Sequence, residues 1–595
     1  MRRQPRIQVA ALLAVIVVAI SLAGCDDACE QPLCPDCPDP QECPDCDGVV
    51  IVGDVLVQDQ ADLEALAGVT QINGALELDG GDDPAAINDL RPLAGLRQVQ
   101  ELRIQATALV DLHGLDGLRT IGGRLQVGDN AELRTLAGLD SLRFAVRIEL
   151  YRDAVLDSID ALARIEGLQE LSVFDQDSLA TLDVFASLDD LAALTVADCP
   201  SLVTLPVSVD LPSLQTVTLR NAPLLDAIRL GASPPPLLDR MELADLAGLR
   251  HLEGLDGMAA LRQLEMIRMS GLVDLAGMGS LPALERLDLA DAPALASLEG
   301  ATDLSSLRLA AFRDLAALSD LSGLPALPAL EDLLIMGFAG TSLAGLPALP
   351  QLSELEIWNC SAITDLSGFP SVTTPRLLRL TGFPNLTTLG GSPEIAKFER
   401  IDCRSLGIVD LDLQTEATAC KTLWIENCQD LASLAGRVFF PNLEVLYLGF
   451  CPALTSLGDG GAWPNLLRVT VDRCDGLTML AGLGSLPDLE FLTVTDCSGL
   501  TDLTGVDLPP VFRWLSVRQC SQLVSLDGVQ ELEDVDFITL TGNDQLAGLD
   551  GLSGLRRVEE RLEVTFNTSL GDAAVLAFVA GLEYWGSLDV QGNGP

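Results

Sequence analysis

Cysteines are the residues of this sequence whose type and spacing come nearest to a chemical site. Two Cys-x-x-Cys pairs lie near the N-terminus, Cys34 with Cys37 and Cys43 with Cys46. Four thiolates in a tetrahedron can hold zinc. Only five residues separate these two pairs, whereas zinc-binding pairs usually lie about 12 to 20 residues apart. The spacing therefore argues against a zinc site.

Disulfide formation is the other chemistry open to these thiols. Prolines between the cysteines stiffen the segment, and neighbouring thiols pair with each other in an oxidising compartment. We expect a stiff spacer stapled by disulfides, with zinc binding and a redox role as weaker alternatives. Five cysteines follow Cys25 in this segment, an odd number, so one thiol would stay free or link to another chain. The disulfide candidates are Cys29, Cys34, Cys37, Cys43 and Cys46.

Catalytic chemistry has few candidates in the rest of the chain. The only two histidines, His113 and His251, stand alone in segments expected to be solvated turns. The sequence contains no Gly-x-Ser-x-Gly, no His-Glu-x-x-His and no phosphate-binding Gly-x-x-x-x-Gly-Lys motif. We expect no enzyme, no metal site and no cofactor.

A second set of cysteines reveals the element that positions every side chain. Five of them recur every 23 residues, at 428, 451, 474, 497 and 520. Each is the last residue of the same short sequence pattern, as in Leu492-Thr-Val-Thr-Asp-Cys497. The pattern Leu-x-Leu-x-x-Cys/Asn-x-x-Leu continues in both directions from residue 49 to the end, which gives about 24 units. The pattern resembles that of leucine-rich repeat proteins. The resemblance implies a mostly β solenoid of the α/β type, a right-handed superhelix with a parallel concave sheet and short turns or 3₁₀ pieces on the convex side.

The residue types within one repeat unit can be explained by their expected positions in the coil. Leu492 and Val494 alternate with Thr493 and Thr495, so each unit opens with a short strand whose apolar side faces inward. The closing Cys or Asn lies where the chain turns off the strand. An Asn amide can bond the backbone of the turn there, and a Cys offers a compact apolar side chain with a weak donor. We expect the nine cysteines of the solenoid to be buried, reduced thiols.

The N-terminus combines basic residues with an apolar run. Three arginines, at 2, 3 and 6, precede the apolar run 9–20, which is followed by Leu-Ala-Gly-Cys25. This arrangement resembles a bacterial lipoprotein signal peptide. The resemblance implies that Cys25 is lipidated and anchors the chain to a membrane. We expect a signal peptide at 1–24, a Cys/Pro-rich tether at 25–48, the solenoid at 49–571 and a C-terminal cap at 572–595. The expected location is the cell envelope of a Gram-negative-type bacterium, on the outer or the inner membrane, with the solenoid exported to the periplasm or the cell surface.

Charge limits the partners. The chain carries 86 acidic and 36 basic residues and a net charge of −50. Such a surface repels phosphate backbones, so nucleic acid is excluded as a partner. The charge also keeps a long, apolar-cored molecule in solution.

Two early stretches, 72–78 and 121–127, resemble receptor L domains, a branch of the leucine-rich repeat superfamily.

Outward strand positions are where a ligand would bind, because each position recurs as a ladder on the concave face. Exposed aromatic and arginine side chains are enriched at recognition sites. They suggest a non-catalytic binding module for a protein or a glycan, in adhesion, cell contact or recognition. In the alternative they only stack on one another, and the protein is a structural, envelope-organising lipoprotein without a dedicated ligand. The candidate ligand-binding residues are Trp358, Trp424, Tyr447, Arg468, Phe491, Trp514, Arg518 and Phe537.

Overall fold

The computed structural model describes residues 7–8, 49–413, 415–434, 440–458 and 463–594. These residues form two units. The first contains residues up to 284 together with 300–303, and the second contains 285–299 and the residues from 304 onward. Cys25 and the tether cysteines lie outside the described residues. Their lipidation and disulfide pairing therefore stay predictions.

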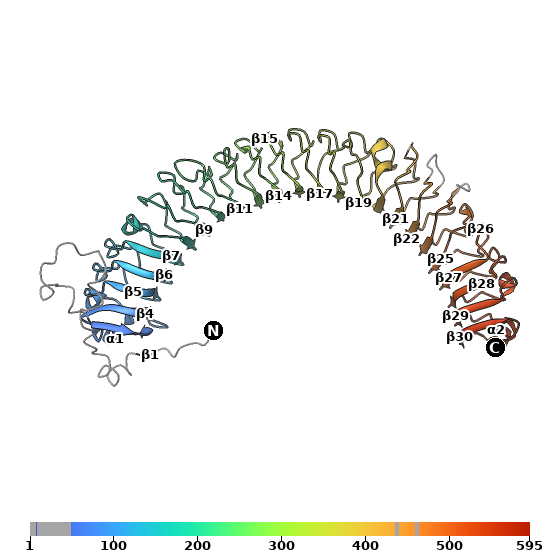
Figure 1. The fold of residues 1–595 in the computed structure, drawn as a ribbon, viewed down its shortest axis with the longest axis horizontal. Helices are drawn as coiled ribbons and strands as arrows, with labels where there is room; N and C mark the ends of the chain where they lie inside the picture. Colours follow the sequence, from blue (N-terminus) through green and yellow to red (C-terminus); the bar gives the residue numbers. More distant parts are fainter. Residues whose placement is uncertain (1–6, 9–48, 414, 435–439, 459–462, 595) are drawn as a thin grey trace, which may run out of the picture. The chain divides into compact units, whose positions relative to one another are not determined.

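The first unit is a stack of parallel strands joined by loops (Figure 1). β4 pairs with both β2 and β3, and each later main strand up to β12 pairs with the next one along the chain. β1 pairs with β3, and β13 with β15. The short helices are α1 (Gln60–Glu64), η2 (Pro84–Ala86), η3 (Arg91–Leu93) and η4 (Asp160–Leu162). The strands are β1 (Ile7–Gln8), β2 (Val49–Val52), β3 (Val55–Val57), β4 (Val69–Asp79), β5 (Gln98–Gln105), β6 (Thr120–Gly128), β7 (Phe144–Tyr151), β8 (Glu170–Phe174), β9 (Ala193–Ala197), β10 (Thr216–Arg220), β11 (Arg240–Ala244), β12 (Gln263–Ile267), β13 (Gly279–Ser280) and β15 (Ala301–Asp303).

The second unit repeats this arrangement. Its main strands pair in parallel from β14 to β30, and β24 pairs with β26 on the loop side. Its helices are η5 (Pro393–Lys397), η6 (Asp550–Leu552) and α2 (Asp572–Val579). The strands are β14 (Arg286–Ala290), β16 (Leu309–Arg313), β17 (Asp332–Met336), β18 (Glu354–Trp358), β19 (Leu377–Phe383), β20 (Arg400–Leu406), β21 (Thr422–Glu426), β22 (Val445–Gly449), β23 (Arg468–Asp472), β24 (Gly484–Ser485), β25 (Phe491–Thr495), β26 (Val506–Asp507), β27 (Val511–Arg518), β28 (Asp534–Thr541), β29 (Arg557–Thr565) and β30 (Tyr584–Gln591).

The architecture confirms the predicted fold class. The chain forms a mostly β parallel solenoid of about 23 turns, against the predicted 24 or so. In each unit the strands line the inner side of the curve, and 3₁₀ pieces lie among the loops opposite them (Figure 1). Among the described residues, no helix is long and apolar enough to cross a membrane.

Alternation along each strand builds the core. In β25, Leu492 and Val494 are fully buried, whereas Phe491, Thr493 and Thr495 are half-exposed. The next strand places Leu515 and Val517 beside those two buried residues. Because the register advances by one coil at a time, each inward position becomes a continuous apolar ladder. No coil could bury these side chains alone.

A left-handed residue ends most of the strands. Asp496 has a φ of 51° and Asp129 a φ of 60°, in the region that Gly, Asn and Asp tolerate best. This requirement explains the frequent Asp, Asn or Gly immediately before the closing position of the repeat. Phe450 and Phe566 occupy the same position with φ values of 53° and 58°, and a bulky side chain is strained there.

The closing residue satisfies the backbone of the turn. Asn130 donates from Nδ2 to the carbonyl oxygens of Gly128 at 3.0 Å and Ile104 at 3.2 Å. Cys497 directs its thiol at the equivalent carbonyls, those of Thr495 at 3.4 Å and Val471 at 3.9 Å. Cys and Asn can replace each other at the closing position because both are compact donors that reach the same two carbonyls.

The last coil contains the predicted helix. α2 precedes β30, and Asp572 at its start accepts a hydrogen bond at 2.8 Å from Nδ2 of Asn593. Trp585 and Leu588 on β30 are 41% and 37% exposed, although their register partners on β29, Val558 and Leu562, are fully buried. The outer side of this coil therefore presents apolar side chains to solvent.

Candidate ligand-binding face

The outward residues of the second unit form three columns on its strand face, which we name by the strand β25. Phe491 defines the first column, Thr493 the middle column and Thr495 the last column. Every neighbouring strand contributes one residue to each column, and adjacent coils are about 4.8 Å apart. Each coil therefore places three residues on this face.

The structure places all eight predicted residues on this face, but in different columns. The register confirms that Phe491 and Phe537 flank Trp514 and that Tyr447 follows Trp424. The first column holds Arg468, Phe491, Trp514 and Phe537, the middle column Trp424 and Tyr447, and the last column Trp358 and Arg518.

The middle-column aromatics are held by their neighbours. The rings of Trp424 and Tyr447 stack with centroids 3.7 Å apart and an interplanar angle of 14°. The guanidinium groups of Arg404 and Arg400 lie 5.6 and 5.8 Å from the Trp424 ring, and its Nε1 donates to Glu426 at 3.0 Å. Stacking and cation–π contacts of this kind fix a ring in one orientation.

The first column is more open. The Trp514 side chain is 38% exposed, and its ring centroid lies 5.5 Å from that of Phe537, tilted by 36°. On the other side, the guanidinium of Arg468 lies 4.3 Å from the Phe491 ring centroid. This column offers a partly exposed aromatic strip that ends in a cation.

Two candidates in the last column have polar atoms left without partners. Nε1 of Trp358 and Nε of Arg518 are buried, and neither has a hydrogen-bond partner in the described part of the chain. An unpaired buried donor costs free energy in the folded state. Both positions therefore have hydrogen-bonding capacity that their neighbours do not use.

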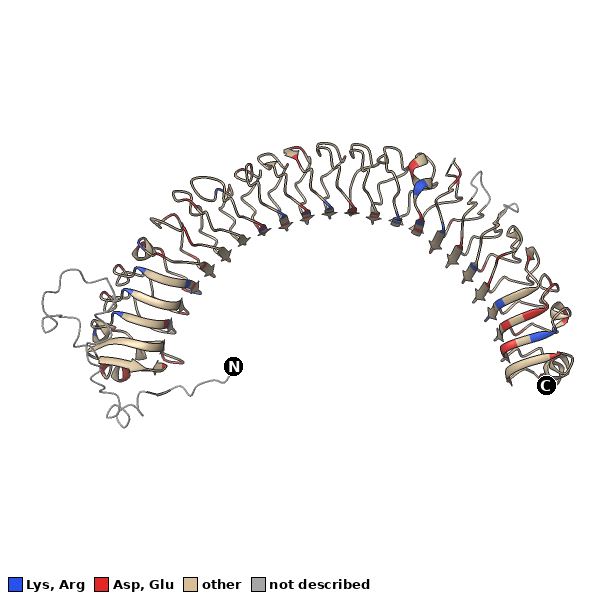
Figure 2. Cartoon of the chain, viewed as in Figure 1, with Lys and Arg blue, Asp and Glu red and all other residues tan. Residues whose placement is uncertain are grey.

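Arginine–carboxylate ladders form the second chemical feature of the strand face, and the sequence analysis did not identify them. Pairs in register include Arg103 with Glu77 at 3.1 Å in the first unit and Arg379 with Glu356 at 2.9 Å in the second. Figure 2 shows the acidic and basic residues along the strands of both units. Most of these pairs are half-exposed, so each contributes little to stability by itself.

Two carboxylates of the middle column are buried. Asp402 is fully buried, and both its oxygens bond Arg400, at 2.7 and 3.1 Å. Arg379 approaches the same carboxylate at 3.5 Å. Asp288 is 3% exposed and bonds Arg286 and Arg313. A buried carboxylate needs such partners to stay charged.

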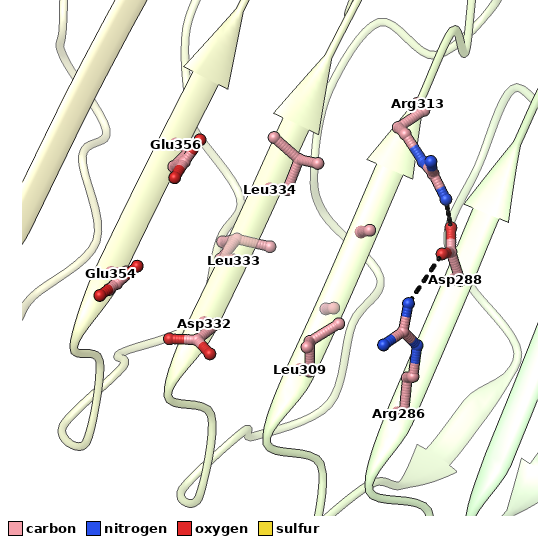
Figure 3. A pocket seen from close by; sticks show the side chains of 11 residues that line it. Arg286, Asp288, Leu309, Arg313, Asp332, Leu333, Leu334, Glu354 and Glu356 are labelled. Atoms are coloured by element: carbon pink, nitrogen blue, oxygen red, sulfur yellow. Dashed lines mark hydrogen bonds and ion pairs between the residues drawn. The ribbon is translucent and has the colours of Figure 1, made fainter.

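A hollow of about 280 Å³ opens on this face beside Asp288. It forms because the middle column has only Ala311 at this coil, between Asp288 and Leu334. Arg286 and Arg313 line one side, and Figure 3 shows Asp332 and Glu354 on the other, on neighbouring strands. We name this cavity the Ala311 hollow.

The two histidines lie on the loop side, as expected. His113 bonds Asp116 at 3.0 Å, and that hydrogen bond raises the pKa of the imidazole. His251 bonds Asp274 at 2.7 Å. In the described residues, neither ring has a Ser, Thr or Cys as a hydrogen-bond partner. These pairs have the character of turn contacts.

The nine solenoid cysteines are buried and free of disulfides. Burial raises the pKa of Cys199 and Cys360 to about 11 and that of Cys497 and Cys520 to about 12. These four cysteines are therefore neutral thiols, and the reactive form of cysteine is the thiolate. Across the described ranges, no three His, Cys, Asp or Glu side chains gather as a metal site would require.

Strand pairing and buried leucines together define a parallel β solenoid with leucine-rich coils. No protein-family profile matches the chain, and no curated protein matches it. Solved structures that it resembles include the TLR13–ssRNA13 complex, with 16% identity over 91% of this chain and 87% of the other and a TM-score of 0.23. Another is the Leptospira interrogans LRR protein LIC12759, with 14% identity over 70% and 94% and a TM-score of 0.22. A third is the LRR ectodomain of the Arabidopsis thaliana receptor kinase GASSHO1/SCHENGEN3 in complex with CASPARIAN STRIP INTEGRITY FACTOR 2, with 12% identity over 91% and 88% and a TM-score of 0.19. Likeness at this level carries no functional argument, and the fold assignment rests on the strand pairing itself.

Proposed function

We propose that the protein is a non-catalytic binding module that recognises a protein or a glycan through the strand face of its second unit. The observation that carries the proposal is the partly exposed first column, in which Arg468, Phe491, Trp514 and Phe537 follow one another on consecutive coils. Aromatic side chains bury a large area on binding and lose little conformational freedom. A column of them at one-coil spacing suits an extended ligand.

Preorganisation supports the same proposal. Trp424 is already fixed by Tyr447, Arg404 and Glu426. A ring that is held in place before binding loses less entropy when a ligand packs on it. The middle column therefore offers a rigid platform beside the open strip of the first column.

Membrane attachment is part of the proposal. The sequence Leu-Ala-Gly-Cys25 after an apolar run resembles a lipoprotein signal, and a lipid there would tether the solenoid to the cell envelope. Mass spectrometry of the membrane fraction tests this, because it would detect a diacylated Cys25 at the mature N-terminus. A Cys25→Ala variant serves as the control. An unmodified mature N-terminus would remove the anchor from the account.

The test of binding is a crosslinking pull-down from intact cells. Combined replacement of Trp424, Tyr447 and Trp514 by Ala should lower recovery of specific partners by about tenfold or more, because hot-spot aromatics contribute about 2 kcal/mol each. Trp585→Ala is the matched control, since Trp585 is exposed but lies on the last strand outside the three columns. Unchanged recovery with unchanged circular dichroism would refute the proposal.

A structural role without a ligand is the second candidate. Its specific support is that the aromatics contact one another, as the Trp424–Tyr447 and Trp514–Phe537 pairs do. Such cross-strand pairs stabilise a sheet by a few tenths of a kcal/mol to about 1 kcal/mol each. On this alternative, the triple replacement would lower stability and leave partner recovery unchanged.

A further inference from the structure

Two acidic residues at the Ala311 hollow lack the partners that most strand-face carboxylates have. Asp332 and Glu354 are register neighbours in the first column. Among the described residues, neither has a lysine or arginine within ion-pair distance. Leucines flank them in that column, with Leu309 before Asp332 and Leu377 after Glu354. The leucines separate the acidic pair from the nearest arginines of the same column.

Nearby carboxylates show the usual arrangement. Glu356, on the same strand as Glu354, pairs with Arg379 at 2.9 Å, and Asp288 bonds two arginines. Like charges directly opposite each other destabilise a sheet. Burial, followed by the charge of Glu354, raises the pKa of Asp332. A cation between Asp332 and Glu354 would relieve this repulsion.

The shape of the hollow selects the kind of cation. Ala311 forms a small apolar floor, and Leu309 and Leu334 form apolar walls. Arg286 and Arg313 on the opposite wall are already bound to Asp288, as the dashed lines in Figure 3 show. An aliphatic stem can lie on the apolar floor while its charged head reaches the carboxylates. Lysine and arginine side chains have this construction.

We infer that the Ala311 hollow receives a lysine or arginine side chain of a protein partner, between the carboxylates of Asp332 and Glu354. Trp358 projects from the same strand and the same face as Glu354. The inference rests on the proposed function and narrows it, because it selects a protein with an exposed basic residue over a neutral glycan. The overall charge of −50 favours the approach of such a partner.

The test uses the full chain and two short peptides, because a partner need not be known. One is acetyl-Gly-Ser-Arg-Ser-Gly-amide, and the other has citrulline, a neutral isostere, in place of arginine. Ligand-observed NMR titration at about 150 mM salt measures both affinities, since distant charges are largely screened there. The arginine peptide should bind about three- to tenfold more tightly, as one charge-assisted site would give.

Three variants test whether the preference for arginine depends on the hollow or on the general negative charge of the chain. Asp332→Asn with Glu354→Gln should abolish the preference for arginine. Ala311→Leu should weaken binding of the arginine peptide without any change of charge. Glu531→Gln with Glu533→Gln makes the same charge change at exposed positions away from the hollow and should keep the preference.

Several results would overturn the inference. These are no preference for arginine in the unchanged protein, a preference that survives Asp332→Asn with Glu354→Gln, and an equal loss in the Glu531/Glu533 control. The last result would show that attraction is diffuse. If the aromatic triple variant loses its partners while the Asp332/Glu354 variant keeps them, the proposed function stands and this inference fails.

Discussion

Asp153 occupies a position where the fold requires a hydrogen-bond donor. It is the closing residue of its coil, next to Asn130 in the ladder, and it is fully buried. Its Oδ1 accepts from the backbone nitrogen of Asn130 at 2.8 Å, as the oxygen of an asparagine would. Its Oδ2 is buried without a partner among the described residues. By analogy with Asn130, this atom faces backbone carbonyls, which also accept hydrogen bonds.

A proton on Asp153 resolves this conflict, and burial raises its pKa from 3.8 to about 7. The unfolded chain releases this proton near pH 4, whereas the folded chain keeps it up to about pH 7. Stability therefore falls between these two values as pH rises, and then stays level. A rise of about 3 pH units corresponds to at most about 4 kcal/mol, or about a thousandfold in the local opening equilibrium.

Asp153→Asn should remove this loss, because an amide supplies the donor at every pH. Hydrogen exchange with mass spectrometry, corrected for intrinsic exchange rates, measures protection of peptides that cover β6 to β8. At pH 8 the variant should be better protected by up to about three orders of magnitude, and near pH 4 it should match the parent protein. Asp157→Asn is the control, because Asp157 is exposed. Equal protection of parent and variant at pH 8 would refute the reasoning.

Two further predictions concern single residues of the second unit. Asp402→Ala should destabilise the coils around β20 by about 2 to 3 kcal/mol, since Arg379 and Arg400 lose a buried counter-charge. Urea titration followed by tryptophan fluorescence measures this, because Trp424 is the register neighbour of Asp402, and a loss below about 0.5 kcal/mol would contradict the assigned role. Phe566→Asn should stabilise the last coils by about 1 kcal/mol, because Asn tolerates a φ of 58° better than Phe does. Hydrogen exchange in β29 and β30 checks it, with Phe537→Asn, at an ordinary strand position, as a control that should destabilise.

The sequence predicted the fold because one short pattern specifies every coil. Leu492 and Val494 alternate with polar residues, and a period of 23 residues fixes which residue lies beside which. The same period predicts Phe491 and Phe537 beside Trp514, and the strand register confirms it. A repeat with such strong alternation leaves little freedom of register.

The Ala311 hollow and the arginine ladders were not predicted, because they depend on several columns at once. Aligning the coils in rows would have shown Asp332 beside Glu354 and the small Ala311 beside Leu334, so that signal was present in the sequence. The ion pairs of Asp288 with Arg286 and Arg313 have no such signal in the sequence. They depend on side-chain rotamers, which a repeat pattern does not specify.

The central claim, that the strand face of the second unit binds a partner, is tested most directly by site-specific photocrosslinking in intact cells. A photoreactive amino acid at Thr493, in the middle column beside Phe491 and Trp514, should form a discrete adduct that disappears when Trp514 is replaced by Ala. The same amino acid at Glu531, which is exposed and outside the strands, should form none. An adduct of equal yield from both positions, or none from Thr493 in folded protein of normal abundance, would contradict the account.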